Sequence, residues 1–152
     1  MKRLPIMKRL PIWFLLLASA GACATRTVVD QSQSQVAPSL VVERFLQAVN
    51  TRNLETMGRL FGNEDGPFGD RRGREETELR MDMLVEILTH DDYRIVSERR
   101  VAGASAPSNR ISVDMVMPNG IMVRDVGFTV VLASSNRWLI TLIDVEKITL
   151  AA

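Results

Sequence analysis

Residues 111–132 read ISVDMVMPNGIMVRDVGFTVVL and contain two apolar runs around one turn. In the first run every second residue from Ile111 to Met117 is apolar, which is typical of a strand with one buried face. The pair Asn119-Gly120 favours a tight hairpin turn. The second run, 122–132, places four apolar residues on one face: Val126, Phe128, Val130 and Leu132. The stretch therefore predicts an antiparallel hairpin that buries one of its faces.

The residues on either side of this hairpin predict two further strands. Upstream, the pattern changes from helical to alternating after Asp91-Asp92, and residues 93–98 begin a strand. Downstream, the polar residues 134–136 predict a turn, and a last strand is expected over 137–148. Because the last strand is apolar on both faces, we expect it to be central, with helices covering one face. Together, the hairpin and the two flanking strands are expected to form a mostly antiparallel sheet of about four strands.

Two stretches before the sheet have the apolar period of helices. Ser39 follows a proline, as at a helix start, and residues 40–49 carry a stripe of Val41, Phe45, Ala48 and Val49 with Val42 and Leu46 beside it. Asn53 is placed to cap a second helix over 54–61, which ends at Gly62. Both helices are therefore expected to bury one face against the sheet.

A third helix is expected over 75–90, with an apolar face formed by Leu79, Met83 and Ile87 and widened by Leu84 and Leu88. The glycine-punctuated segment 62–73 before it predicts a loop. Its acidic residues do not have the spacing of a calcium loop, and Pro67 interrupts them. We interpret the arginines at 71–74 as a solvated face. Phe68 is interpreted as a plug at one end of the sheet, with a partner contact as the alternative.

Helices that precede an antiparallel sheet are typical of the α+β class. Residues 41–57, VVERFLQAVNTRNLETM, and the closing residues 137–140, RWLI, resemble the nuclear transport factor 2-like superfamily. The resemblance spans about Ser39 to Leu150 and implies three N-terminal helices packed on a curved sheet, forming a cone with a pocket. Because that fold hosts enzymes, carriers and scaffolds, the resemblance indicates a fold rather than an activity.

The N-terminus has the three parts of a secretory signal. It begins MKRLPIMKRLPI, a basic hexapeptide written twice, so that either Met1 or Met7 is a candidate start. An apolar run over 10–18 and the small residues 19–22 follow. The run is shorter than the roughly 18–20 residues that a membrane-spanning helix needs. We therefore expect residues 1–22 to be a cleaved signal peptide.

Residues 17–23, LASAGAC, resemble the lipobox of bacterial lipoproteins, in which the cysteine carries acyl chains and becomes the new N-terminus. The resemblance implies lipid attachment at Cys23, the only cysteine, followed by a flexible tether over 23–38 and a single domain over 39–150. Two A-x-A triplets within 20–24 also fit ordinary signal cleavage, so a soluble secreted protein is the alternative.

Composition limits the classes of partner. After cleavage before Cys23, 15 Lys and Arg remain against 18 Asp and Glu, a formal charge of −3. Such a chain is not attracted to nucleic acid or to an anionic membrane, so its membrane attachment must come from acyl chains on Cys23. The lipobox resemblance, with Ala24 after the cysteine, implies the periplasmic side of the outer membrane over the inner membrane. With one cysteine and one histidine in the chain, no metal site and no cofactor are predicted.

Five residues are candidates for chemistry: His90, Tyr93, Asp114, Asp125 and Asp144. The single histidine is interpreted as a group at the C-terminal end of the third helix rather than as a base or metal ligand. The three aspartates lie on expected strands and are candidates to face a pocket as acids with a raised pKa. For Asp125 and Asp144, near strand ends or bends, the alternative is a solvated carboxylate. The superfamily includes ketosteroid isomerases and polyketide cyclases, which use acids and an aromatic hydroxyl or a histidine. No position here matches that set, so none is assigned as catalytic.

These observations favour a membrane-anchored envelope lipoprotein with a non-enzymatic binding or scaffolding domain, for a protein partner or a small apolar ligand. The alternative is an enzyme of the isomerase, cyclase or hydrolase type that uses the pocket. The interior of the domain distinguishes the two. A filled apolar interior favours binding, whereas two titratable groups converging in a cavity favour catalysis.

Overall fold

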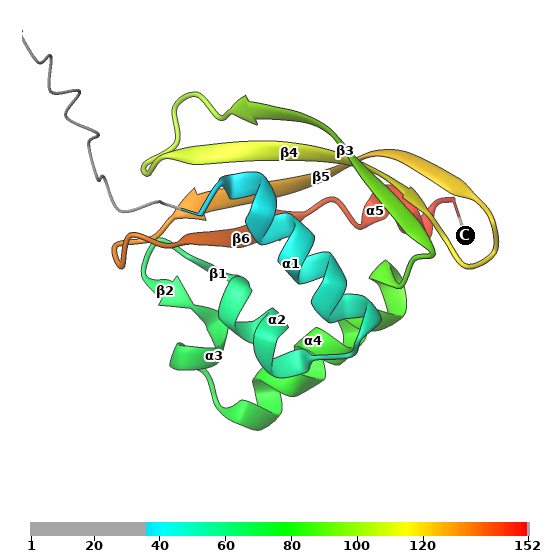
Figure 1. Ribbon diagram of the computed structural model, residues 1–152. Helices are drawn as coiled ribbons and strands as arrows, with labels where there is room; N and C mark the ends of the chain where they lie inside the picture. The colour runs from blue at the N-terminus through cyan, green and yellow to red at the C-terminus, as the bar shows by residue number, and fades with distance from the viewer. Residues whose placement is uncertain (1–35, 152) are drawn as a thin grey trace, which may run out of the picture. The chain divides into compact units, whose positions relative to one another are not determined.

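The computed structural model describes residues 36–151, so the expected signal peptide, Cys23 and most of the tether lie outside the described residues. Four helices precede the large sheet, with a small hairpin between the second and the third: α1 (Pro38–Asn50), α2 (Leu54–Leu60), α3 (Phe68–Arg71) and α4 (Arg74–Leu88) (Figure 1). They are followed by β3 (Asp92–Arg100), β4 (Ser108–Val116), β5 (Met122–Leu132), β6 (Trp138–Ile143) and α5 (Glu146–Thr149). The predicted α+β class, with helices before the sheet, is confirmed.

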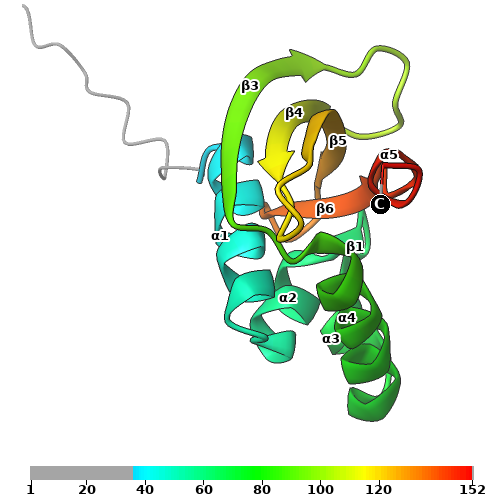
Figure 2. The same cartoon turned by 90° about the vertical axis from the view of Figure 1, so that its right-hand side faces the viewer.

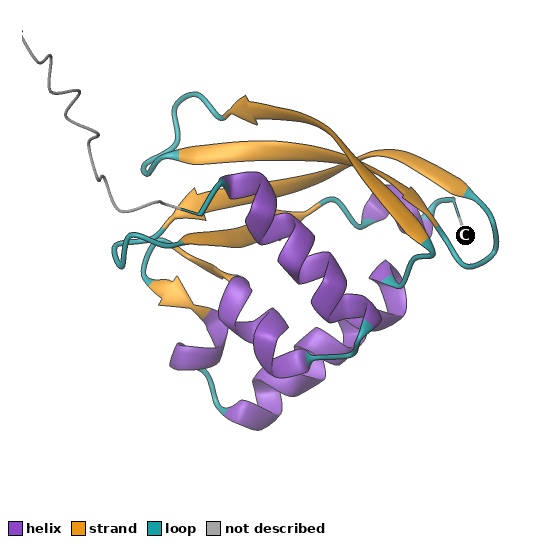
Figure 3. Cartoon of the chain, in the orientation of Figure 1, coloured by secondary structure: helices purple, strands orange, loops and turns teal. Residues whose placement is uncertain are grey.

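The four long strands form one antiparallel sheet in the order β3-β4-β5-β6. The alternation predicted for the central hairpin is confirmed at Ile111, Val113, Met115, Val126, Phe128 and Val130, which lie in the core, but not at Leu132, which is only partly buried. Figure 2 shows the sheet curving, and Figure 3 shows α1, α2 and α4 gathered on one of its sides. We call the side that faces these helices the inner face and the opposite side the outer face.

Both hairpin turns after β4 and β5 use a left-handed residue. The Gly120 amide donates to the Met117 carbonyl (2.8 Å), and Gly120 has a φ of 77°. The Asn136 amide donates to the Ala133 carbonyl (2.9 Å) in the same way, with a φ of 60°. Glycine and asparagine adopt this backbone conformation more readily than other residues, which is why the two polar segments form tight turns.

The first two helices pack as their patterns predict. α1 begins at Pro38, one residue earlier than expected, and buries Val41, Val42, Phe45, Leu46, Ala48 and Val49. The Asn53 side chain caps α2 by accepting a hydrogen bond from the Thr56 amide (3.0 Å). None of the helices in the described range is both long and apolar enough to cross a membrane.

The predicted apolar face of the third helix is wrong at Leu79 and Met83, whereas Leu88 is buried and Leu84 and Ile87 pack against the core as expected. In α4, Leu79 and Met83 are 64% and 61% exposed, and the residues that α4 buries are Thr77, Met81, Val85 and Leu88. Thr77 lies directly over Gly58 of α2, since a Cβ at Gly58 would come within 2.6 Å of the Thr77 Cγ2. A small pair at this crossing lets the two helices approach closely, and the approach selects the face that α4 turns inward.

The prediction of a central last strand is also wrong. β6 stands at one end of the strand order and ends at Ile143, and the short α5 occupies part of the segment expected as strand. Its free side is partly covered, because Phe61 forms a single parallel bridge to Ile140. Leu142, on the outer face, is 59% exposed. Apolar residues on both faces therefore did not indicate a central position here.

The segment 62–73, expected as a loop, contains a small hairpin and α3. β1 (Gly62–Asn63) pairs with β2 (Gly66–Pro67), and Gly62 is buried against the Gly66 carbonyl. Phe68 packs edge-on to Phe61 (6.4 Å between ring centroids), and Phe61 in turn packs against the core residue Phe45 (6.3 Å). Phe68 therefore continues the core toward the surface, as its interpretation as a plug requires.

Candidate functional site

The inner face of the sheet and the helices enclose a core of apolar side chains. The largest fully buried side chains include Phe45, Phe128, Met57, Met81 and Met115, which come from α1, α2, α4, β4 and β5. Among the described residues the buried polar ones are Thr77, His90, Ser108 and Ser112. No described carboxylate is buried, so the interior supplies no acidic group to a ligand.

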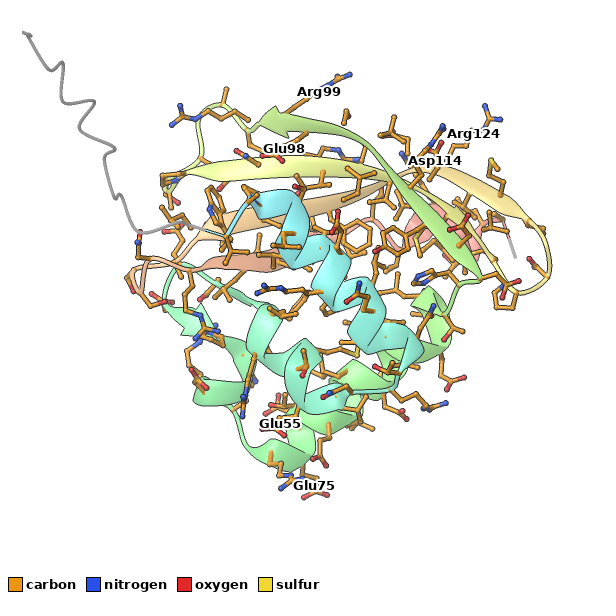
Figure 4. The ribbon with its side chains drawn as sticks, viewed as in Figure 1. Glu55, Glu75, Glu98, Arg99, Asp114 and Arg124 are labelled. Atoms are coloured by element: carbon orange, nitrogen blue, oxygen red, sulfur yellow. The ribbon has the colours of Figure 1, made fainter. Side chains whose placement is uncertain are left out.

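The three candidate aspartates lie on the outer face or next to it. On β4, Arg110, Ser112 and Asp114 alternate with core residues, so their side chains point away from the helices. Figure 4 shows Asp114 and Arg124 on the side of the molecule away from Glu55 of α2. We call one set of charged residues the outer-face cluster: Arg94, Arg110, Asp114, Asp125, Asp144 and Lys147.

Ion pairs connect the members of the outer-face cluster. Lys147 of α5 lies between two carboxylates, with its Nζ 2.8 Å from Asp125 Oδ2 and 3.7 Å from Asp144 Oδ2. The Arg110 Nη2 is 3.6 Å from Asp144 Oδ2. Asp114 accepts from the Arg94 guanidinium (3.1 Å) and from the backbone amide of Asp125 (3.0 Å). All three aspartates therefore have cationic partners.

Two backbone features make room for this cluster. The register of β4 and β5 shifts between Val113 and Met115, and opposite the shift Asp125 has a left-handed φ of 55°. At Gly127 an added Cβ would lie 2.2 Å from the Arg110 Cζ, so the absence of a side chain leaves the space that the guanidinium occupies. Bulges of this kind redirect side chains on a sheet.

The pKa directions are opposite to those expected for a catalytic acid. The Lys147 ammonium, followed by the Ser112 hydroxyl, lowers the pKa of Asp125 to about 2. The Asp125 backbone amide, with Arg94 adding to it, lowers the pKa of Asp114. Both carboxylates are ionised at neutral pH. The expectation of acids with a raised pKa facing a pocket is therefore wrong for Asp114 and Asp125.

His90 and Tyr93 contact each other through their rings. The ring centroids are 5.3 Å apart with the planes nearly perpendicular. The polar atom of His90 has another partner, because His90 Nδ1 is 2.8 Å from the Leu88 carbonyl oxygen. Burial, and then the Glu43 carboxylate, raise the pKa of Tyr93. His90 follows the C-cap residue Thr89 and contacts the last carbonyl of α4, so its position at the helix end is the one expected from the sequence.

No metal centre is found in residues 36–151, where no group of three or more His, Cys, Asp or Glu side chains could hold an ion. The acidic residue Asp65 pairs with Arg71 (3.5 Å) and with the Asn63 amide (3.3 Å). Arg72 and Arg80 lie 4.9 and 5.0 Å from the centre of the Phe68 ring. The loop is thus held by ion pairs and cation–π contacts within the chain.

One surface hollow was missed by reasoning from the sequence. It has a volume of about 480 Å³ and is lined by α1, α2 and the residue before β6, with three arginines at its margin: Arg44, Arg59 and Arg137. We call it the arginine hollow. Its arginines are far apart in the chain and share no motif, so only the contact of α1, α2 and β6 brings them together.

Comparison with known proteins gives little beyond this geometry. No family model and no curated protein matches the chain. Among solved structures, a protein of unknown function from Cytophaga hutchinsonii, described as NTF2-like, matches with 17% identity and a TM-score of 0.37. The match covers 77% of this chain and 98% of that protein.

Proposed function

We propose that this protein is a lipid-anchored protein of the bacterial envelope, and that its nuclear transport factor 2-like domain binds a protein partner at its surface without catalysis. The filled interior carries this proposal. A ligand pocket needs concave space with a few polar groups aimed into it. Here the space between helices and sheet holds close-packed apolar side chains such as Phe45, Phe128 and Met115.

The arrangement of the candidate residues supports the same conclusion. Asp114, Asp125 and Asp144 pair with cations at or next to the outer face, and His90 binds the end of α4. General acid–base chemistry requires titratable groups that reach one reacting atom together. These residues instead stabilise the sheet and its connections, which leaves the surface as the place for recognition.

The anchor follows from the N-terminal sequence. A basic start, a short apolar run and LASAGAC before the rest of the chain fit a lipoprotein signal that ends at Cys23. Each buried CH₂ of an acyl chain contributes about 0.8 kcal/mol to membrane attachment, and more than one chain is needed for a lasting anchor. The mature chain, with a formal charge of −3, then needs no electrostatic attraction to the lipid.

The anchor is tested on protein isolated from membranes. We expect mass spectrometry of the N-terminal peptide to show an acylated Cys23, and Cys23→Ser to move the protein from the membrane fraction to the soluble fraction. An unmodified chain beginning at Cys23 or Thr25 would contradict the anchor and support secretion as a soluble protein.

Partner binding is tested by chemical cross-linking in intact membranes. We expect a defined protein to be cross-linked to the domain through surface residues. Recovery of the domain alone under conditions that capture other envelope complexes would contradict the binding role.

A further inference from the structure

We propose that the arginine hollow binds an acidic segment of the protein partner. This inference rests on the proposed function and adds to it the chemistry of the partner. The site would recognise a peptide chain with closely spaced carboxylates, because the hollow presents several guanidinium groups around one concave space.

The charged residues that line the hollow are all cationic. Its lining consists of Arg44, Arg59 and Arg137 together with uncharged residues: Gln47, Ala48, Thr51, Asn53, Thr56 and Leu60. Among the described residues, neither Arg44 nor Arg137 pairs with an acidic side chain. Arg59 pairs with Glu55, which does not line the hollow. Cationic groups are therefore concentrated here in a mature chain whose formal charge is −3.

One of the three arginines is held in position by the backbone. The Arg137 Nη2 donates to the Arg59 carbonyl (3.2 Å), which ties the turn before β6 to α2. The Arg59 guanidinium pairs with Glu55 one turn away on the same helix, and because both side chains are well exposed this pair holds them only weakly. Since ordering a long side chain costs entropy on binding, an arginine that is already held loses less of it. A guanidinium also binds a carboxylate through two parallel hydrogen bonds.

The size of the hollow and the charge of the domain favour a peptide over a lipid surface. The volume of about 480 Å³ lies within the range of about 300–1,000 Å³ that is typical of ligand sites. The net negative charge of the mature chain opposes binding to an extended anionic surface. Clusters of arginines are a recurring means of binding acidic motifs.

The test uses the full mature protein and a labelled peptide in which Glu alternates with Ser, with a Gln-for-Glu peptide as the neutral probe. Binding is followed by fluorescence anisotropy. We expect saturable binding of the acidic peptide only, weakened by added salt. The double variant Arg44→Gln/Arg137→Gln is expected to lower its affinity about tenfold or more, because two of the three cations are removed.

The matched control is Arg99→Gln/Arg124→Gln, which removes two exposed arginines of β3 and β5 that do not line the hollow. We expect it to leave the affinity for the peptide unchanged. Equal losses in both double variants, or no saturable binding by the unmodified protein, would overturn the proposal. Binding of anionic vesicles that depends on Arg44 and Arg137, with no binding of the peptide, would also overturn it and assign the hollow to lipid.

Cross-linking in membranes separates this inference from the proposed function. Capture of one partner by the unmodified protein and by the Arg99/Arg124 control, but not by the Arg44/Arg137 variant, supports both. Equal capture by all three proteins overturns the role of the hollow and leaves the binding function in place. Capture by none contradicts the binding function, whereas the peptide titration still decides what the hollow binds.

Discussion

At the scale of single residues, Asp125 shows how an apparent catalytic candidate is used for structure. Its left-handed backbone at the register shift directs the carboxylate to Lys147, and its amide binds the carboxylate of Asp114. The sequence placed these aspartates on strands, but it contained no signal for their partners. Lys147 comes from a helix that replaces part of an expected strand, and Arg110 reaches Asp144 across the space left by Gly127.

The cause of the low pKa of Asp125 can be tested by Lys147→Met. We expect the pKa of Asp125 to rise from about 2 toward its ordinary value, because the Lys147 ammonium is the largest cause of the shift. An NMR pH titration of the side-chain carboxyl carbon measures it.

Arg94→Met is the matched comparison for Asp114. The backbone amide of Asp125, which this substitution retains, is the first cause of the lowered pKa of Asp114. We therefore expect a smaller rise in the pKa of Asp114 than Lys147→Met produces in that of Asp125. A larger rise would contradict the assignment of the backbone amide as the main cause.

The same contacts determine how the free energy of unfolding changes with pH. Because the pKa of Asp125 is lower in the folded state, its stabilising effect is present above the unfolded pKa of about 3.9 and is lost as pH falls toward 2. The carboxylate is largely exposed, so we expect the loss to be less than about 1 kcal/mol. Urea unfolding measured between pH 5 and pH 2 checks this. We expect the free energy of unfolding to fall less steeply with decreasing pH in Lys147→Met than in the unmodified protein.

At the scale of elements, the accuracy of prediction depended on how many apolar faces a segment has. The central hairpin and α1 each have one apolar face, and the structure buries it. α4 has apolar residues on more than one face, and the contact between Thr77 and Gly58 goes with an orientation that buries Met81 and Val85 and leaves Leu79 and Met83 exposed. β6 is apolar on both faces although it lies at the sheet edge, so its position depends on pairing partners that periodicity does not reveal.

A pair of substitutions in α4 tests the corrected face. We expect Met81→Ala to lower the free energy of unfolding by about 2–5 kcal/mol, because Met81 is 1% exposed and packs in the core. Leu79→Ala, at a residue that is 64% exposed, should change it by less than about 0.5 kcal/mol. Urea denaturation of both variants gives the comparison, and the reverse order of costs would restore the face inferred from the sequence.

At the scale of the whole molecule, the sequence predicted the α+β class. It left open whether the interior is filled with apolar side chains or holds a cavity with titratable groups. It did not indicate the arginine hollow, because the hollow assembles from three positions that are apart in the sequence, Arg44, Arg59 and Arg137. The core holds Phe45, Phe128 and three methionines, which is why we propose binding at the surface. The central claim is therefore that an anchored domain with a filled interior binds another protein.

Native mass spectrometry of the protein gently extracted from membranes tests this claim most directly. The account expects the mass of the acylated chain beginning at Cys23 together with that of a bound protein, and no small molecule retained by the domain after the partner is removed. A stoichiometric apolar small molecule that stays with the isolated domain would contradict it, because such a ligand needs the interior space that Phe45 and Phe128 occupy.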